Sequence, residues 1–314
     1  MEHKQTGKNG ILHSLIGEPT PAKASGLTYS LAAILSVVVA FLFLILVSLL
    51  GLAKDGYEDA DWYLYCSYLL TPITFLLVAL FVLRWSRQSV GAEICAQACP
   101  VKYFVIAILL QCGLLCLSQL NELFLGWLAK FGYEDTPIQL PSLDGFGFVG
   151  VLFTVALMPA IFEELIFRGL LLKGMKSFGT VGAVLLNGAL FAIFHQNPAQ
   201  TLYQFCCGVA FAFVAIRAGS ILPTVVSHFI NNALVVTLLK FGRTELQGGV
   251  MLAVLIASIL CLVASMVWLF FFDKGKNAQN GEKNKAEQKR FFTYASVGVA
   301  MYALTWISVF LMGL

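Results

Sequence analysis

The stretch LTYSLAAILSVVVAFLFLILVSLLGLA, Leu27–Ala53, contains no Asp, Glu, Lys or Arg. The hydrocarbon core of a bilayer is roughly 30 Å thick, and a helix needs about 20 apolar residues to cross it. This segment is therefore long enough to span a membrane. It is also too long, and it begins too far into the chain, to be a cleaved signal peptide, so we interpret it as a retained signal-anchor.

Apolar runs of comparable length recur along all 314 residues. The chain is 59% hydrophobic and only 12% charged, with a mean hydropathy of +0.84, whereas a soluble domain is about 25% charged. The short alternating segments of a membrane β-barrel do not occur in it. The sequence therefore predicts an all-α, polytopic membrane protein with eight or nine transmembrane helices. The candidate spans are Leu27–Ala53, Trp62–Leu83, Tyr103–Ala129, Phe146–Phe167, Thr180–His195, Leu202–Ile216, Ile221–Leu239, Val250–Phe272 and Phe291–Met312.

Basic residues predict the orientation. With nine spans and a cytoplasmic N-terminus, most of the 20 Lys and Arg residues fall in cytoplasmic segments, and the outer segments hold only Lys54, Lys130, Lys240 and Arg243. This bias follows the positive-inside rule. The net charge of +3 is scattered over short loops, which argues against nucleic acid as a partner.

The same pattern suggests four regions. We expect a cytoplasmic tail over residues 1–26, N-terminal transmembrane helices over 27–140, a central group of helices over 146–240, and C-terminal helices over 241–314. A polar cytoplasmic linker is expected at 273–290 within the last region.

Two motifs are interpreted as structural. The eight cysteines include no C-x-x-C pair of the kind found in zinc ribbons, and we expect them to pack as small apolar residues. The segment GFGFVG, Gly145–Gly150, fits G-x-G-x-x-G, but it follows a loop and opens a membrane span. A dinucleotide-binding fingerprint must instead leave a strand within a βαβ unit.

The stretch MPAIFEELIFRG, Met158–Gly169, places three charges inside an apolar span. A charged side chain near the bilayer centre costs roughly 2.5 kcal/mol or more, so such residues usually have a function or a partner. On a helix, Glu164 and Arg168 are one turn apart on one face, in the favourable acid-before-base order. We expect Arg168 to neutralise Glu164, which leaves Glu163 free to face another group.

Two of the four histidines, His195 and His228, also lie in the membrane region. An antiparallel hairpin closing at Gly179 would bring Glu163 level with His195. Asn232 lies one turn after His228 on the same helix face, whereas Asn231 does not. One cavity could therefore hold Glu163, Glu164, Arg168, His195, His228 and Asn232.

These side chains suit hydrolysis by an activated water. A carboxylate and a neutral imidazole can remove a proton from water, and a second imidazole and an amide can donate hydrogen bonds to an oxyanion. The sequence has no H-E-x-x-H, G-x-S-G or G-x-G-D motif of other intramembrane proteases.

Three motifs resemble those of a known family. EELIFR (Glu163–Arg168) resembles E-E-x-x-x-R, FAIFH (Phe191–His195) resembles F-x-x-x-H, and HFINN (His228–Asn232) resembles H-x-x-x-N. The family is the CPBP intramembrane proteases, which includes the CAAX prenyl endopeptidases and the bacterial Abi proteins. The resemblance covers about Phe146 to Leu239, and it implies that the central helices, residues 146–240, form the catalytic core.

The resemblance implies a glutamic endopeptidase without a cofactor. Glu163 would activate water together with His195, and His228 and Asn232 would line the oxyanion hole. Glu164 and Arg168 would be supporting residues, and Phe191 would pack against the ring of His195. The partners would be the lipid bilayer and a membrane-associated peptide or protein, with prenylated or CAAX-like proteins among the candidates. The expected location is a bacterial plasma membrane.

Three alternatives remain open. Glu163, His195 and His228 could instead bind zinc in a metalloprotease. The same polar residues could form a proton relay or a transport site. The chain could also be a non-catalytic membrane protein, such as a bacteriocin self-immunity protein.

Overall fold

The computed structural model describes residues 16–86, 95–135, 138–242, 248–273 and 283–314, and every regular element in these ranges is a helix. Most of the expected N-terminal tail, including His3 and His13, lies outside these ranges, as does the middle of the expected polar linker.

The chain has nine helical segments that are long and apolar enough to cross a membrane, counted over the residues that the structure describes. The expectation of eight or nine spans is thereby confirmed at nine. The α-helices are α2 (Pro21–Leu49), α3 (Asp61–Ser86), α5 (Lys102–Leu114), α6 (Leu117–Ala129), α7 (Phe146–Val151), α8 (Met158–Glu164), α9 (Leu172–Gly174), α10 (Gly179–Phe194), α11 (Thr201–Ala218), α12 (Leu222–Lys240), α13 (Gly248–Val267) and α14 (Lys285–Met312).

Capping residues determine where the first and last spans begin, and these starts differ from those that hydropathy predicts. The first span begins at Pro21, earlier than predicted, because the Thr20 side chain accepts a hydrogen bond from the Lys23 amide and proline suits the first helical turn. The last span begins at Lys285, within the predicted linker 273–290, because the Asn284 side chain accepts from the amides of Ala286 and Glu287. Residues 285–290 are therefore helical and do not form a loop. A helix can continue beyond the apolar core, so hydropathy does not mark such a start.

The fourth span, Phe146–Gly174, is one continuous helix with two wider π-helical segments. These segments, Leu152–Leu157 and Leu165–Leu171, lie directly before and after α8. Pro159 in the first turn of α8 has no N–H to donate to the carbonyl of Val155, which weakens the regular helical ladder there. Such π-bulges occur frequently at functional sites, and here they bracket the adjacent glutamates.

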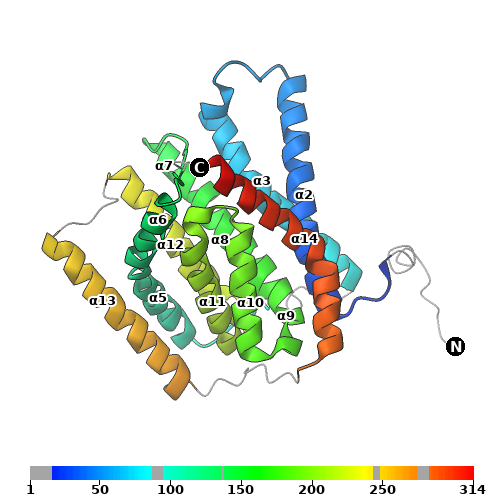
Figure 1. Cartoon of the computed structure of the whole chain (residues 1–314), viewed down its shortest axis with the longest axis vertical. Coiled ribbons are helices and arrows are strands. Elements are labelled where there is room, and N and C mark those ends of the chain that lie inside the picture. Colours follow the sequence, from blue (N-terminus) through cyan, green and yellow to red (C-terminus); the bar gives the residue numbers. More distant parts are fainter. Residues whose placement is uncertain (1–15, 87–94, 136–137, 243–247, 274–282) are drawn as a thin grey trace.

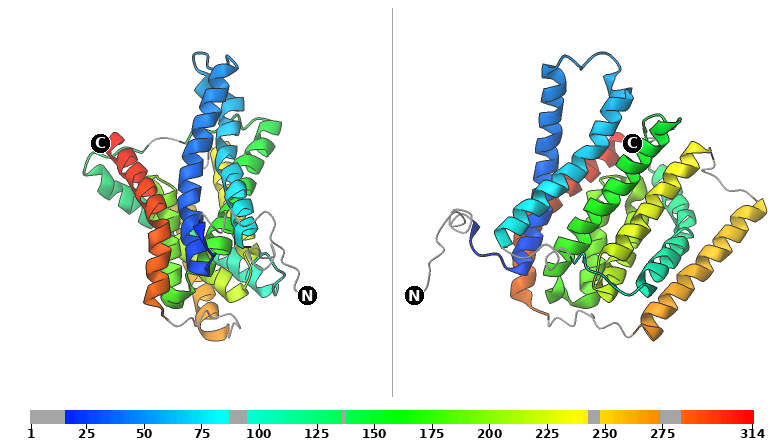
Figure 2. Two further views of the ribbon diagram at one scale, coloured as in Figure 1. Left: turned by 90° about the vertical axis from the view of Figure 1, so that its right-hand side faces the viewer. Right: turned by 180° about the vertical axis from the view of Figure 1, so that it is seen from behind.

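The central helices carry the polar motifs, and the outer helices surround them (Figure 1). The α2–α3 hairpin and α14 pack along one side, and α13 lies against α5 at the opposite edge. The view from behind shows the same order, with α13 at the outer edge (Figure 2). The exposed side chains of Phe41 on α2 and Leu260 on α13, each 63% accessible, are those of lipid-facing helices.

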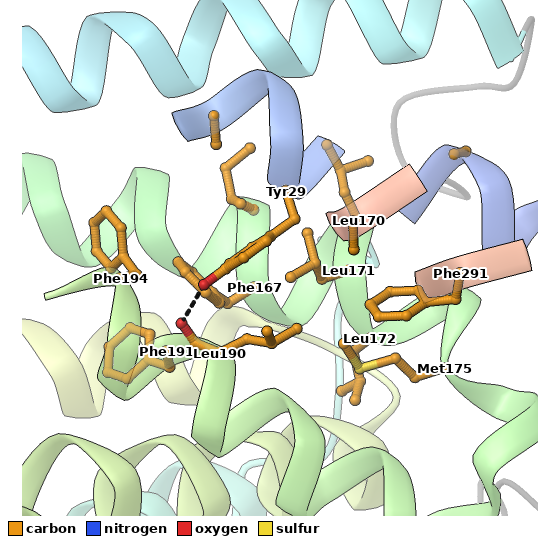
Figure 3. Close-up of a cluster of buried hydrophobic side chains, with 14 of the residues drawn as sticks. Tyr29, Phe167, Leu170, Leu171, Leu172, Met175, Leu190, Phe191, Phe194 and Phe291 are labelled. Carbon is orange, nitrogen blue, oxygen red and sulfur yellow. Dashed lines mark hydrogen bonds between the residues drawn. The ribbon is translucent and has the colours of Figure 1, made fainter. Parts of the chain in front are cut away.

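The core that supports the site combines aromatic and aliphatic side chains (Figure 3). The ring of Phe167 lies 5.0 Å from that of Phe191 and 5.2 Å from that of Phe194. The Tyr29 hydroxyl, from α2, donates to the Leu190 carbonyl over 2.9 Å. This bond satisfies a polar group that would otherwise be buried without a partner. The core therefore attaches the N-terminal helix to the helix that carries His195.

Candidate active site

Glu164 and Arg168 form a buried ion pair. The Arg168 Nη1 donates to Glu164 Oε1 over 2.8 Å, and both side chains are fully inaccessible. A second guanidinium nitrogen, Nη2, donates to the Gly208 carbonyl on α11 over 3.4 Å. The hydrogen bond to Gly208 offsets part of the cost of removing the pair from water, while Glu164 Oε2 and Arg168 Nε have no hydrogen-bond partner among the described residues.

Three aromatic rings enclose the Arg168 guanidinium. Its central carbon lies 4.2 Å from the ring centre of Phe191, 5.4 Å from that of Phe211 and 5.9 Å from that of Phe167. Cation–π attraction is strong where water is excluded. Arg168 is therefore held by rings from three segments.

Gly188 and Gly208 allow α11 to come close to α10. A Cβ atom at Gly208 would lie 2.7 Å from the Cα of Gly188, which is too close for any side chain. Small residues at such a crossing let two membrane helices pack backbone to backbone. The crossing brings the Gly208 carbonyl within reach of Arg168.

Glu163 faces the two histidines. Its Oε2 lies 3.9 Å from His195 Nε2 and 3.8 Å from His228 Nε2. The side chain is 10% accessible, and Oε2 has no hydrogen-bond partner within the described part of the chain. Glu163 is thus the one of the two adjacent glutamates that is left without an arginine partner, and it lies between the imidazoles.

The tautomer of His195 follows from its surroundings. Its Nδ1 lies 2.8 Å from the Phe191 carbonyl, which can only accept a hydrogen bond, so Nδ1 carries the proton. In the neutral ring, Nε2 then presents a lone pair toward Glu163. The ring of Phe191 lies 4.6 Å away at 70°, in edge-to-face contact, and holds the imidazole in this orientation.

His228 bridges the two glutamates. Its Nδ1 lies 3.0 Å from Glu164 Oε1 and donates to that carboxylate, while Nε2 faces Glu163. The ring packs 5.8 Å from that of Phe211.

Asn232 lies one turn after His228 on α12, and no hydrogen bond among the described residues joins its side chain to His228 or Glu163. Its single hydrogen bond within the described residues is to its neighbour, with Asn231 Nδ2 donating to Asn232 Oδ1 over 3.2 Å. Asn231 in turn accepts from Gln111 Nε2 over 2.6 Å and from the Tyr203 hydroxyl over 2.9 Å.

Sequence reasoning missed Gln111 and Tyr203, which lie on α5 and α11. The one usable signal was Gln111, a lone amide in an otherwise apolar segment.

The distances from Glu163 to His195 and His228 bear on the zinc alternative. Zinc ligands at about 2.0–2.1 Å from the ion lie roughly 3.3 Å from one another. The carboxylate–imidazole distances here are longer, and no group of three or more His, Cys, Asp or Glu in the described ranges is arranged to hold a metal ion. Glu163 thus lies farther from each imidazole than one zinc ligand lies from another, and no chemical step is assigned to a metal.

Comparisons with known proteins bear on the same region. Residues 145–234 match the family model of the "Type II CAAX prenyl endopeptidase Rce1-like" proteins. The matched segment contains all three motifs, and the flanking helices lie outside it. No curated protein and no solved structure matches the chain. Residues 145–234 are thus similar to the CAAX-type intramembrane proteases of the CPBP family.

Proposed function

We propose that this protein hydrolyses peptide bonds of membrane-associated proteins or peptides with a water that Glu163 and His195 activate. The observation that carries the proposal is the position of Glu163 Oε2, which lies within 4 Å of two imidazole nitrogens and has no hydrogen-bond partner in the described residues. The family match supports a protease in general, and these contacts support the division of roles.

In the proposed reaction, a water held between Glu163 and His195 attacks the scissile carbonyl carbon. Glu163 takes the water proton, which makes it the general base, and the neutral His195 Nε2 orients the water by accepting its other hydrogen. The attack forms a tetrahedral intermediate with a negative oxygen. The C–N bond then breaks as Glu163 returns the proton to the leaving nitrogen.

His228 and Asn232 are proposed to stabilise the negative oxygen. A protonated His228 Nε2 and the Asn232 amide are the available donors on this face of α12, and donors aimed at a developing charge are effective where water is excluded. Glu164 would hold the His228 ring in place by accepting a hydrogen bond from Nδ1, and Arg168 would hold Glu164 in place.

The substrate is proposed to enter from the bilayer or its surface, with the N-terminus of the enzyme in the cytoplasm. The basic ends of several segments meet at one end of the molecule, where Lys102 pairs with Asp273 at 2.7 Å and Arg217 donates to the Asp273 carbonyl. This clustering supports the orientation expected from the positive-inside rule.

The test compares membranes that contain the wild-type protein with membranes that contain Glu163→Gln, an isosteric change that removes the base. New peptide termini should appear with wild type alone, and they should persist after exhaustive metal chelation. Termini that vanish on chelation and return with zinc would support the metalloprotease alternative. Identical termini in both membranes would contradict hydrolysis by Glu163, and a substrate-driven flux in liposomes would then support the transport alternative.

A further inference from the structure

We propose that Gln111, Tyr203 and Asn231 form a relay of hydrogen bonds that fixes which end of the Asn232 amide faces the substrate. The inference rests on the proposed oxyanion role of Asn232 and adds positioning residues to it. These three residues come from α5, α11 and α12, so the relay joins three transmembrane helices.

The two amides of the relay are buried, and its three residues are closely spaced. Gln111 is 2% accessible and Asn231 is 9% accessible. The Asn231 Oδ1 accepts two hydrogen bonds, one from Gln111 Nε2 at 2.6 Å and one from the Tyr203 hydroxyl at 2.9 Å. Gln111 Nε2 also lies 3.5 Å from the Tyr203 hydroxyl.

These contacts fix the direction of the Asn231 amide. Because its oxygen faces two donors, its NH₂ group must point the other way, and there it donates to Asn232 Oδ1. The oxygen of Asn232 is then occupied, and the NH₂ group of Asn232 is left available. That group is the hydrogen-bond donor that an oxyanion needs.

Gln111, at the far end of the relay from Asn232, favours this orientation of the amides. Gln111 Oε1 is buried and has no partner among the described residues. If every amide turned over, the Gln111 NH₂ group would occupy that apolar site with unpaired N–H bonds. Buried unpaired N–H groups are rarer in proteins than under-satisfied carbonyl oxygens. The surroundings of Gln111 therefore favour the orientation in which the Asn232 NH₂ group is free, although Asn232 is two residues further along the relay.

The test compares Asn231→Asp with Asn231→Ala. An ionised Asp keeps both accepted bonds and nearly the same shape, but it has no donor for Asn232. Its second oxygen would accept from the Asn232 NH₂ group and so remove the oxyanion donor. We expect Asn231→Asp to lower kcat about 100-fold, near the roughly 10²–10³-fold loss for one missing oxyanion donor, with KM nearly unchanged. Asn231→Ala should lower kcat less than Asn231→Asp does.

A purely structural role predicts the opposite order, because Asp resembles Asn more closely than Ala does. A kcat for Asn231→Asp at or above that of Asn231→Ala would overturn the relay. Relative to wild type, the loss in Asn231→Asp should also shrink as the pH falls, because a protonated Asp regains a donor.

If Asn231→Asp fails to fold, Gln111→Glu and Gln111→Met repeat the comparison. We expect Gln111→Glu to lower kcat more than Gln111→Met does. Tyr103→Phe is the matched control: Tyr103 is a buried tyrosine of α5 whose hydroxyl faces Asp273, so kcat should not change.

Full activity in Asn232→Ala would overturn the oxyanion role and the relay with it. A large loss in Asn232→Ala combined with the wrong order at Asn231 would overturn the relay alone.

Discussion

Glu163 and Glu164 are adjacent in the chain, yet their surroundings differ completely. Successive residues of a helix point about 100° apart, so each glutamate faces a different set of neighbours. Glu164 accepts from Arg168 and His228, whereas Glu163 lies between His195 and His228 without an arginine. The assignment of one glutamate to structure and the other to catalysis is a proposal that follows from this difference.

The first prediction concerns the buried pair. Arg168→Leu leaves the Glu164 carboxylate without its guanidinium partner and should lower the free energy of unfolding by about 3–5 kcal/mol. Glu164→Leu combined with Arg168→Leu should recover part of this loss, though His228 then lacks its acceptor. Thermal melting in detergent measures both variants.

The exposed pair Glu287–Arg290 serves as the control, because Arg290→Leu at a surface pair should cost about 1 kcal/mol or less. A double variant no more stable than Arg168→Leu alone would contradict a buried pair at this position.

The second prediction concerns Phe191, whose ring contacts both His195 and Arg168. Phe191→Leu should lower kcat roughly tenfold, because the imidazole loses the contact that holds its orientation and a small misplacement at a reacting group is costly. Phe75→Leu is the control: Phe75 is equally buried and contacts Phe167 and Phe194, but neither histidine. Equal kcat losses in the two variants would indicate a general packing effect and no specific role for Phe191.

At the scale of elements, the site depends on two local features of the helices. The π-helical segments on either side of α8 change the helix register around the glutamates, and the glycine crossing sets the distance between α10 and α11. Both features place main-chain and side-chain groups from different spans within hydrogen-bonding distance.

The third prediction tests the crossing. Gly208→Ala should destabilise the protein and reduce activity, because its Cβ would meet the Gly188 backbone and separate the helices. Gly126→Ala is the control: Gly126 lies in α6 with open space around it, and replacing glycine by alanine within a helix should be neutral or stabilising by up to about 1 kcal/mol. Activity and melting temperature measure both. A Gly208→Ala protein as stable as Gly126→Ala would refute the close crossing.

Sequence reasoning succeeded where one helix or one hairpin decided the geometry. The spacing of Glu164 and Arg168 predicted their pairing, and the turn at Gly179 predicted that Glu163 and His195 would meet. It failed where contacts join helices distant in the chain, as with Gln111 and Tyr203 around Asn231. No local pattern encodes such contacts. The sequence-based prediction also placed the starts of α2 and α14 too late in the chain. Their N-caps depend on the single side chains Thr20 and Asn284, and a hydropathy average over many residues does not detect them.

At the scale of the whole molecule, the outer helices form the lipid-facing surface and the central helices hold the polar residues. The segments that carry the glutamates and Arg168 contact α2 and α3 as well as α11 and α12. This arrangement is the usual one for ionisable groups inside membrane proteins, which face the interior of the bundle.

The fourth prediction concerns orientation. Reporter domains fused after residue 16 and after residue 273 should be active in the cytoplasm, and reporters fused after residues 55 and 240 should be active outside. The expected order follows from nine spans and from the distribution of lysine and arginine. A reporter after residue 55 that is active in the cytoplasm would reverse the orientation.

The most direct measurement of the central claim is kcat for wild type and Glu163→Gln in liposomes, with a peptide substrate identified from the compared membranes. The proposal predicts that Glu163→Gln melts at nearly the wild-type temperature and loses roughly 10²–10⁴-fold in kcat, the usual contribution of a general base. A Glu163→Gln protein that is folded and turns over substrate at the wild-type rate would contradict the claim that Glu163 activates the attacking water.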